Sequence, residues 1–487
     1  MLFRKPITRS AAALLVAVSC LVLSCSVNPA TGKREFMIVS EAQEIAMGQE
    51  AHPQILAQFG VYPDEELQEY ISRLGKELAA KSERPNLPWT FTLLDDPLVN
   101  AFALPGGFIY ITRGIMAHLN SEAELVGILG HEIAHVTARH GASQMSKQTL
   151  AQIGLVAGVV AAPELAQNYG GLAQQLTGLL FLKYGRDDER QADAFGFRYA
   201  KNSGWDPRAL EGVFDTLGRV SAASGGGGMP AWASTHPAPA NRSELIRQQV
   251  AAEGLGEGQL RVDRDGYLQR LDGMVYGADP RQGFFREGMF YHPQMAFQMR
   301  FPQGWPTQNS RQAVVGINPD RNAMVQLSLR REETVQAAAQ AFFQQQGVER
   351  GQRWDGMRHD PSLAYAFQAR DAQGVPQLGG IVSFLEQGDV ILQLIGYGRT
   401  DTLRGAAPAL RQTLASFAQL RDRRLLSVEP MRLEVQRARS GTSLQAVARN
   451  ASIDAADLEL INAMDGGGSF PSGSLFKTVR GFNPARN

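Results

Sequence analysis

The chain has 487 residues, of which 44% are hydrophobic and 20% charged, and its 48 basic side chains balance its 48 acidic ones. A length of this order predicts about three domains, and the ordinary apolar fraction excludes a wholly disordered protein. The zero net charge argues against a nucleic-acid binder, and the slightly negative mean hydropathy argues against a polytopic membrane protein. The two cysteines lie within the first 25 residues, so no disulfide framework is expected.

Residues 1–24 are predicted to be a lipoprotein signal peptide. A basic start precedes an apolar run over 11–23, which is too short to span a bilayer as a helix. The sequence ending at Cys25 resembles a bacterial lipobox, which implies that Cys25 is lipidated and becomes the first residue of the mature protein. Cys20 is an alternative acceptor. In such lipoproteins Ser26 at the next position favours the outer membrane, so we expect a periplasmic, membrane-anchored protein.

The mature chain begins with a mainly helical region, predicted to be one domain over 25–254. Ser40 and Gln43 have the spacing of a capping box that opens a helix. Apolar and polar residues alternate over 89–93 and 108–112, which predicts two strands.

A zinc-binding motif lies in this region, His131-Glu132-Ile133-Ala134-His135. Two histidines at positions i and i+4 of a helix lie on one face and can bind the same metal ion. Glu132 would then act as the general base on the zinc-activated water that attacks a peptide bond. The motif therefore predicts a zinc metallopeptidase with one Zn²⁺ per chain.

A third protein ligand has to come from elsewhere. His140 follows His131 by nine residues, about half a turn further around a continuous helix, so we expect it to face away from the metal. Glu189 and Asp193 form another i, i+4 pair, in which Glu189 can complete the ligand set and Asp193 can orient a ligand histidine. The neighbouring carboxylates Asp187 and Asp188 are alternatives for the ligand.

The motif, together with Glu189 and Asp193 some 54 residues beyond it, resembles the gluzincin family of the CAAX prenyl proteases, Oma, HtpX and BepA. The resemblance implies a mainly helical zincin domain with a small β-sheet. It also implies that Asn100, Ala101 and Phe102, with the strand over 108–112, form a cleft edge where substrate adds as a further strand.

Two further site residues follow from the same resemblance. His236 would be a fourth zinc ligand that excludes the catalytic water in a latent state, and a glycine-rich segment over 225–228 would let it swing away. Arg242 would stabilise the oxyanion of the tetrahedral intermediate. The apolar stretch over 153–162 is too short to span a membrane and is predicted to be a buried or lid helix; contact with a membrane or with an unfolded client is the alternative.

The remainder of the chain is predicted to hold a linker over 255–284 and two accessory domains. Residues 285–425 alternate with period two and include a hairpin over 381–395, which predicts an α+β domain. Residues 430–482 resemble a LysM module of βααβ order, which implies binding of peptidoglycan; a purely structural module is the alternative.

These observations predict a multidomain, zinc-dependent endopeptidase of the bacterial cell envelope. Its expected substrates are misfolded or misassembled outer-membrane proteins. The alternative is a chaperone-like or peptidoglycan-tethered assembly factor whose peptidase site is latent. Neither interpretation involves a nucleic acid.

Overall fold

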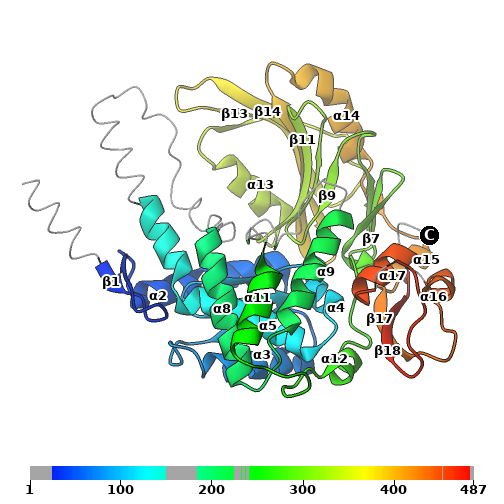
Figure 1. Cartoon of the computed structure of the whole chain (residues 1–487). Helices are drawn as coiled ribbons and strands as arrows, with labels where there is room; N and C mark the ends of the chain where they lie inside the picture. The colour runs from blue at the N-terminus through cyan, green and yellow to red at the C-terminus, as the bar shows by residue number, and fades with distance from the viewer. Residues whose placement is uncertain are drawn as a thin grey trace, which may run out of the picture. The chain divides into compact units, whose positions relative to one another are not determined.

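The computed structural model describes residues 25–149, 184–223, 232, 236, 241–451, 453–464 and 466–482. Two compact units are present (Figure 1). The first comprises the chain up to Met274 together with Leu433–Thr478, and the second comprises Val275–Arg432 and the C-terminal residues from Val479. The predicted signal peptide, the stretch over 153–162 and the glycine-rich segment over 225–228 lie outside the described residues.

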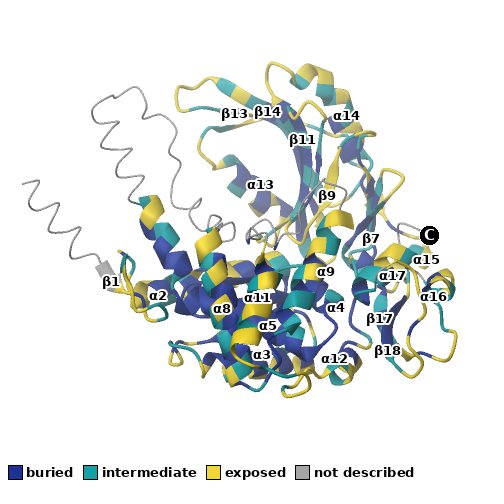
Figure 2. Ribbon diagram, viewed as in Figure 1, coloured by how far each residue is buried: buried dark blue, intermediate teal, exposed yellow. Residues whose placement is uncertain are grey.

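Unit 1 is built around one buried helix, α5 (Glu122–Thr137). Ser121 caps its first turn, because the side chain accepts a hydrogen bond from the amide of Glu124. Figure 2 shows α5 in the dark blue of buried residues. The other helices before residue 275 are α2 (Glu41–Phe59), α3 (Glu65–Ala79), α4 (Arg113–His118), α8 (Arg186–Asn202), α9 (Ala209–Ala223), α11 (Arg242–Ala252) and α12 (Arg264–Arg270). α5 packs against α3, α8 and α9.

The chain enters this unit through a short hairpin of β1 (Cys25–Val27) and β2 (Arg34–Phe36). The capping box predicted at Ser40 and Gln43 is present at the start of α2, which follows the hairpin.

A three-stranded sheet lies beside α5, in the order β3 (Thr90–Leu94), β5 (Phe108–Thr112), β4 (Ala101–Leu104). β5 pairs with β3 in parallel and with β4 in antiparallel fashion. The prediction that 108–112 forms the cleft edge was therefore wrong, because both edges of β5 are already paired. Among the described residues β4 is an edge strand, and it packs against α5.

The predicted linker over 255–284 differs from what the structure shows, because its first part belongs to unit 1. α12 buries Tyr267 and Leu268, and the Tyr267 hydroxyl donates to the carbonyl of Met116. The main chain of 262–263 also accepts hydrogen bonds from the first amides of α5. These contacts make the segment part of the domain that holds the zinc motif.

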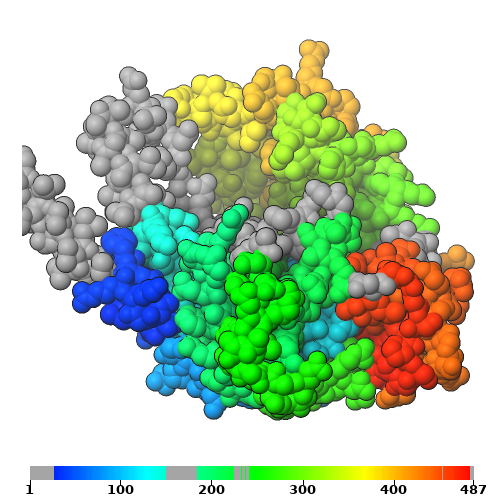
Figure 3. Space-filling model, in the orientation of Figure 1, coloured from blue at the N-terminus to red at the C-terminus, as the bar shows by residue number. Residues whose placement is uncertain are grey.

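The C-terminal segment of unit 1 has strand, helix, helix, strand order: β17 (Arg432–Arg437), α16 (Leu444–Asn450), α17 (Ala455–Ile461) and β18 (Leu475–Arg480). β17 pairs with β18, and α17 contacts α4 and α9. The Nζ of Lys477 is buried and donates to the carbonyls of Ala117 and Leu119 at 2.9 and 2.6 Å. Figure 3 shows this segment, in red, against the green atoms of the same unit. The LysM assignment itself remains a prediction.

Unit 2 is an α+β structure. Its strands are β6 (Phe284–Arg286), β7 (Met289–His292), β8 (Phe297–Arg300), β9 (Thr307–Asn309), β10 (Ala313–Ile317), β11 (Ala323–Arg330), β12 (Val348–Arg353), β13 (Ser362–Arg370), β14 (Pro376–Gln387), β15 (Val390–Arg399) and β16 (Ala418–Gln419). They form a seven-stranded sheet in the order β12-β13-β14-β15-β11-β10-β9 and a four-stranded sheet in the order β16-β8-β7-β6. The hairpin predicted over 381–395 is formed by β14 and β15.

The helices of unit 2 are α13 (Val335–Phe343), α14 (Leu403–Ala415) and the short α15 (Arg423–Leu426). α13 and α14 pack against opposite faces of the larger sheet, since they contact different sets of alternating strand residues.

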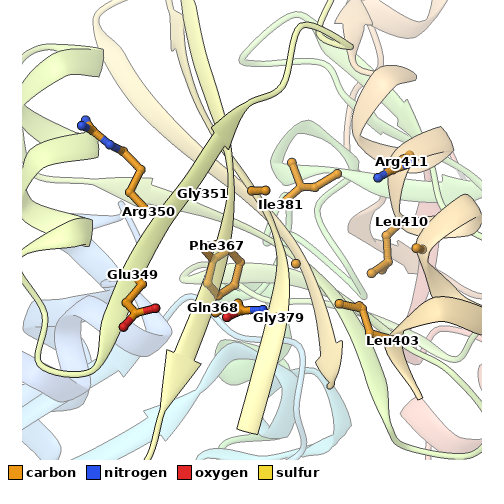
Figure 4. Close-up of a pocket in the computed structure, with 13 residues that line it drawn as sticks. Glu349, Arg350, Gly351, Phe367, Gln368, Gly379, Ile381, Leu403, Leu410 and Arg411 are labelled. Atoms are coloured by element: carbon orange, nitrogen blue, oxygen red, sulfur yellow. The ribbon is translucent and has the colours of Figure 1, made fainter. Parts of the chain in front are cut away.

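A cavity of about 340 Å³ lies between α14 and the strands β12 to β14 of unit 2. Figure 4 shows Leu403 and Leu410 on one side of it and Glu349 and Arg350 of β12 on the other, with Arg350 extending away. The described residues that line it include no histidine, cysteine or serine. The cavity therefore offers apolar surface but no nucleophile with an adjacent base.

Among the residues that the structure describes, no helix combines the length and the apolar character needed to cross a bilayer.

Candidate metal centre

The two motif histidines meet on one face of α5, as their spacing predicts. The Nε2 atoms of His131 and His135 are 3.0 Å apart, and both side chains are buried. Such close nitrogen atoms leave room for one shared metal ion at the end of both rings.

α8 supplies the acidic partner because it approaches α5 very closely at two glycines. A Cβ added at Gly130 would lie 3.1 Å from the carbonyl oxygen of Gly196, and one added at Gly196 would lie 2.9 Å from the amide nitrogen of His131. Backbone contact at this point places Glu189, two turns earlier in α8, beside the imidazoles. Its carboxylate oxygens lie 3.6 Å from His131 Nε2 and 3.5 Å from His135 Nε2.

His236 closes the group. One potential ligand atom from each of His131, His135, Glu189 and His236 lies within 4.8 Å of all the others, and all four residues are buried. The His236 Nδ1 is 2.9 Å from Glu189 Oε1 and 3.3 Å from His131 Nε2. Three imidazoles and one carboxylate form a donor set that suits tetrahedral zinc.

The unsatisfied polar atoms of the site support this assignment. Both carboxylate oxygens of Glu132, which is fully buried, and Oε2 of Glu189 have no hydrogen-bond partner among the described residues. Buried carboxylate oxygens are almost always paired in folded proteins. Their missing partners fit a bound cation at Glu189 and a water or substrate group at Glu132.

Asp193 and Arg242 form a second layer behind His131. Asp193 Oδ1 lies 3.0 Å from His131 Nδ1, the position of an acceptor that fixes the orientation of a metal-binding imidazole. Arg242, the first residue of α11, donates to both oxygens of Asp193 at 2.7 and 2.5 Å. Its Nη1 lies 3.5 Å from Glu189 Oε2. Arg242 is thus committed mainly to Asp193, and its predicted role at the oxyanion remains a prediction.

An aromatic stack holds His236 in place. The ring of Trp232 lies nearly parallel to that of His236, with the centroids 4.7 Å apart and an interplanar angle of 16°. The Arg242 guanidinium lies 5.0 Å from the Trp232 ring and 3.9 Å from the ring of Phe214. Arg242 thus contacts both Asp193 and the aromatic ring that stacks on His236.

The prediction that His140 faces away from the site was wrong. α5 ends at Thr137, and Arg139 adopts a left-handed backbone with a φ of 56°, so the helical rotation does not continue to residue 140. His140 instead returns to the site, with its Nδ1 2.9 Å from that of His135. His140 thus contacts His135 at Nδ1, whereas His135 Nε2 lies beside His131. Tyr184 stacks on the His135 ring with the centroids 3.8 Å apart.

The protonation of these groups follows from burial and from neighbouring charges. Burial, reinforced by three adjacent imidazoles, lowers the pKa of His135 well below its usual value. A neutral imidazole is the form that binds a metal. Burial alone raises the pKa of the Glu189 carboxyl, but cationic neighbours, led by His236, outweigh it and the pKa is lowered. For Asp193, burial is likewise outweighed, chiefly by Arg242, and the pKa is lowered.

The alternative ligands Asp187 and Asp188 lie elsewhere. Asp187 is exposed and pairs with Arg190, whereas Asp188 accepts a hydrogen bond from the amide of Gly185 at the start of α8. The structure thus favours Glu189 among the three carboxylates.

The other predicted site residues, Asn100, Ala101 and Phe102, lie at and just before the edge strand β4. Sequence reasoning missed the glycine pair and Trp232. The sequence does place Gly130 and Gly196 in the two helices that carry the ligands, and this could have indicated their close contact. No comparable pattern marks Trp232.

Comparisons with known proteins agree with this geometry. The family model described as Peptidase family M48 matches residues 65–250. The chain is 31% identical over 195 residues to Metalloprotease YcaL of Escherichia coli K12, covering 37% of this chain and 72% of that protein. It is 32% identical over 259 residues to the Putative beta-barrel assembly-enhancing protease of Vibrio cholerae, covering 50% of this chain and 52% of that protein. It is also 32% identical over 194 residues to Mitochondrial metalloendopeptidase OMA1 of Arabidopsis thaliana, covering 40% and 38%. The chain thus spans about half the length of several of the curated relatives it matches.

Proposed function

The chain belongs to peptidase family M48, and on that premise we propose that it is a zinc-dependent endopeptidase of the bacterial cell envelope that cleaves misfolded or misassembled outer-membrane proteins. The observation that carries this proposal is the convergence of His131, His135 and Glu189 around one point, with Glu132 buried and unpaired beside it among the described residues. A site that had lost its activity would not be expected to retain a buried general base whose oxygens have no hydrogen-bond partner among the described residues.

Each residue has a defined part in the reaction. His131, His135 and Glu189 would hold zinc, which polarises a scissile carbonyl and lowers the pKa of a bound water when it is present. Glu132 accepts a proton from the attacking water and returns it to the leaving amine, as a buried carboxylate without competing donors can do. Asp193, whose Oδ1 lies 3.0 Å from His131 Nδ1, would hold the imidazole proton there and leave Nε2 free to bind the metal.

The edge strand β4 is the proposed binding site for the substrate backbone. An extended substrate can add to an unpaired strand edge through main-chain hydrogen bonds. Asn100, which immediately precedes β4, has a buried side-chain oxygen with no partner among the described residues. That oxygen can accept a hydrogen bond from a substrate amide, while Ala101 and Phe102 contribute the strand itself.

The envelope location rests on the lipobox-like sequence that ends at Cys25. A diacylated cysteine supplies two acyl chains, which together give stable anchoring. The name of the Vibrio cholerae relative, a beta-barrel assembly-enhancing protease, supports outer-membrane proteins as the substrate class. Peptidoglycan binding through residues 430–482 is a further part of this proposal.

A second candidate function is a latent peptidase that assists assembly without cutting. The observation that favours it is the position of His236, whose Nε2 lies 3.7 Å from Glu132 Oε1 while its Nδ1 lies 2.9 Å from Glu189 Oε1. The ring therefore fills the space between the general base and the carboxylate ligand. In this proposal the His236 ring takes the place of the attacking water beside Glu132.

The first test is cleavage of unfolded casein by the purified mature chain, with zinc content measured in parallel. We expect wild type to cleave and Glu132→Gln to lose activity while it retains zinc. Glu66→Gln is the matched control, because the Glu66 side chain is 89% exposed. Cleavage by Glu132→Gln at the wild-type rate would contradict the proposed role of Glu132, and absence of zinc from both proteins would contradict the metal site.

The second test separates active from latent enzyme. If His236 blocks the site, His236→Ala raises the rate of casein cleavage above wild type. Trp232→Ala, which removes the stacked ring, should raise it in the same direction by loosening His236. An unchanged or lower rate in both variants would exclude the latch.

A further inference from the structure

The segment that directly follows Cys25 binds the carboxyl end of the active-site helix. The Asn28 side chain is fully buried, and its Nδ2 donates to the carbonyl of Ala138 at 2.7 Å and to Glu35 at 3.0 Å. Its Oδ1 accepts from the amides of Ala30 and Thr31. Asn28 therefore uses its amide donors and its acceptor in one fixed arrangement.

The next residues remain attached to the same region. The amide of Ile38 donates to the hydroxyl of Ser146, which is buried, and Arg139 donates to the carbonyl of Val39 at 2.6 Å. Strand β1 pairs with β2, so that Cys25 is opposite Phe36. The described chain is thus held in a hydrogen-bonded hairpin from Cys25 onward, and the hairpin is fastened to the peptidase domain.

These contacts also complete the end of α5. The last carbonyls of a helix have no partner within it. Arg84 donates to the carbonyl of Val136 at 2.8 Å, and Asn28 donates to the carbonyl of Ala138. The hairpin is therefore part of the frame that fixes the turn after His135.

The path from Cys25 to the site is correspondingly short. Asn28 lies three residues beyond Cys25, a span of at most about 11 Å. Ala138 lies three residues beyond His135, a helical rise of about 4.5 Å. With the Asn28 side chain and its hydrogen bond between them, the Cα atoms of Cys25 and His135 lie within roughly 25 Å.

We propose that this hairpin is a short, rigid tether that holds the active site close to the bilayer, so that the substrates are unfolded segments exposed at the membrane surface. The inference rests on the proposed function, because it requires a lipidated Cys25 and an active peptidase. It specifies the substrate class by position: chain that emerges from or lies on the membrane, in preference to chain held far above it.

The test compares two reporters on vesicles that carry the lipidated full chain. In the near reporter an unfolded segment lies between its own lipid anchor and a folded spacer; in the far reporter the same segment lies beyond a rigid spacer of roughly 50 Å, farther than the tether reaches. Cleavage is followed by mass spectrometry. We expect wild type to cut the near reporter at least about tenfold faster, because a tether that cannot span the gap gives almost no effective concentration.

The decisive variant carries a flexible Gly/Ser insertion of about 20 residues between Ser26 and Val27, which can extend to about 66 Å. It should cut both reporters at similar rates. The matched control has the same insertion between Gln373 and Gly374, in an exposed turn of unit 2, and should keep the wild-type preference. Cleavage of free casein at the wild-type rate shows that each variant is folded and active.

A readout that does not need activity comes from energy transfer. Asp187 has a side chain that is 78% exposed on α8, so Asp187→Cys can carry a donor dye, with acceptor dyes on the lipids. Transfer should be strong in the parent chain and fall at least about twofold after the tether insertion, because the linker lets the domain move away.

Equal cleavage of the two reporters by wild type, or energy transfer unaffected by the tether insertion, would overturn the proposal. Failure of the chain to associate with the vesicles would overturn it by removing the anchor. If wild type cleaves no casein but shows strong energy transfer, the peptidase function is refuted. The short tether is then still supported.

Discussion

The contact between Asp193 and Arg242 gives two different expectations for what Arg242 does. If Arg242 acts through Asp193, it positions His131 and matters for zinc binding. If it stabilises the oxyanion, it matters for turnover and not for zinc binding. Replacement of each residue, Asp193→Asn and Arg242→Met, and of both together distinguishes these roles.

The magnitudes follow from the burial of the pair. Asp193 is 7% exposed and Arg242 is 4% exposed, and they share two hydrogen bonds. Loss of an outer-layer partner of a metal-binding histidine typically weakens metal affinity by about 10- to 100-fold. Removal of one member of a buried ion pair also lowers the free energy of unfolding by about 3–5 kcal/mol, because the other charge stays buried.

We therefore expect each single variant to bind zinc about 10- to 100-fold more weakly, and the double variant to be little worse than either, since both residues act through one contact. Zinc affinity is measured by competition with a chelator and stability by urea unfolding. The reasoning is refuted if Arg242→Met binds zinc as tightly as wild type while its turnover number falls by about 10²- to 10³-fold, the loss expected for an oxyanion donor.

Two further predictions concern Lys477 and the glycine contact between α5 and α8. Burial lowers the pKa of Lys477 to about 7, against the opposing charge of Glu124 and with Arg264 nearby. The unfolded chain keeps this proton up to about pH 10.5 and the folded chain does not. The free energy of unfolding should therefore rise between pH 7 and 10, by up to about 5 kcal/mol. Urea unfolding at both pH values should show this rise in wild type and no such rise in Lys477→Met. Gly196→Ala should lower the free energy of unfolding by about 1–3 kcal/mol by forcing α8 from α5, whereas Gly218→Ala, whose added Cβ meets nothing within 4 Å, should not. Equal melting curves for these two glycine variants would contradict the close helix contact.

The metal ligands on α5 and α8 were predictable because they depend on local periodicity. Residues four apart share a helix face wherever the helix lies in the fold. The pairs His131 with His135 and Glu189 with Asp193 therefore required only that each segment be helical. That the two faces meet depends on the contact of Gly130 with Gly196, which is set by the packing of two helices far apart in the chain and is visible only in the structure.

His140 was misplaced for the complementary reason. The prediction extended one helix through residue 140, but the chain turns at Arg139, where the left-handed backbone is uncommon for a residue with a side chain. Contacts with distant segments hold it there, since the guanidinium pairs with Glu44 and donates to Val39. No local sequence pattern predicts contacts of this kind.

The order of strands and the domain boundary were missed in the same way. β5 is central because β3, which is separated from it in the chain by β4, pairs with it in parallel, and alternation alone does not reveal a partner. The linker predicted over 255–284 instead belongs to unit 1 as far as Met274. Its attachment depends on Tyr267 and Leu268, two buried side chains in a seven-residue helix too short to show periodicity.

The charges buried at the centre point to a requirement for a divalent cation in the fold itself. Glu132, Glu189 and Asp193 are carboxylates, and Arg242 is the guanidinium that faces two of them. The described centre therefore carries an excess of two negative charges when its imidazoles are neutral, and of one when His236 is protonated, since Glu189 and Glu132 raise the pKa of His236 against the effect of burial. Buried charges that lack compensation destabilise a folded protein. Zinc restores the balance, and we expect its removal with a chelator to lower the melting temperature of wild type substantially and that of Glu132→Gln less, because one carboxylate charge is gone. Because a ligand that binds only the folded state stabilises it in proportion to its affinity, a melting temperature unchanged by chelation would show that the charge excess is relieved in another way, such as protonation of His236 between Glu132 and Glu189.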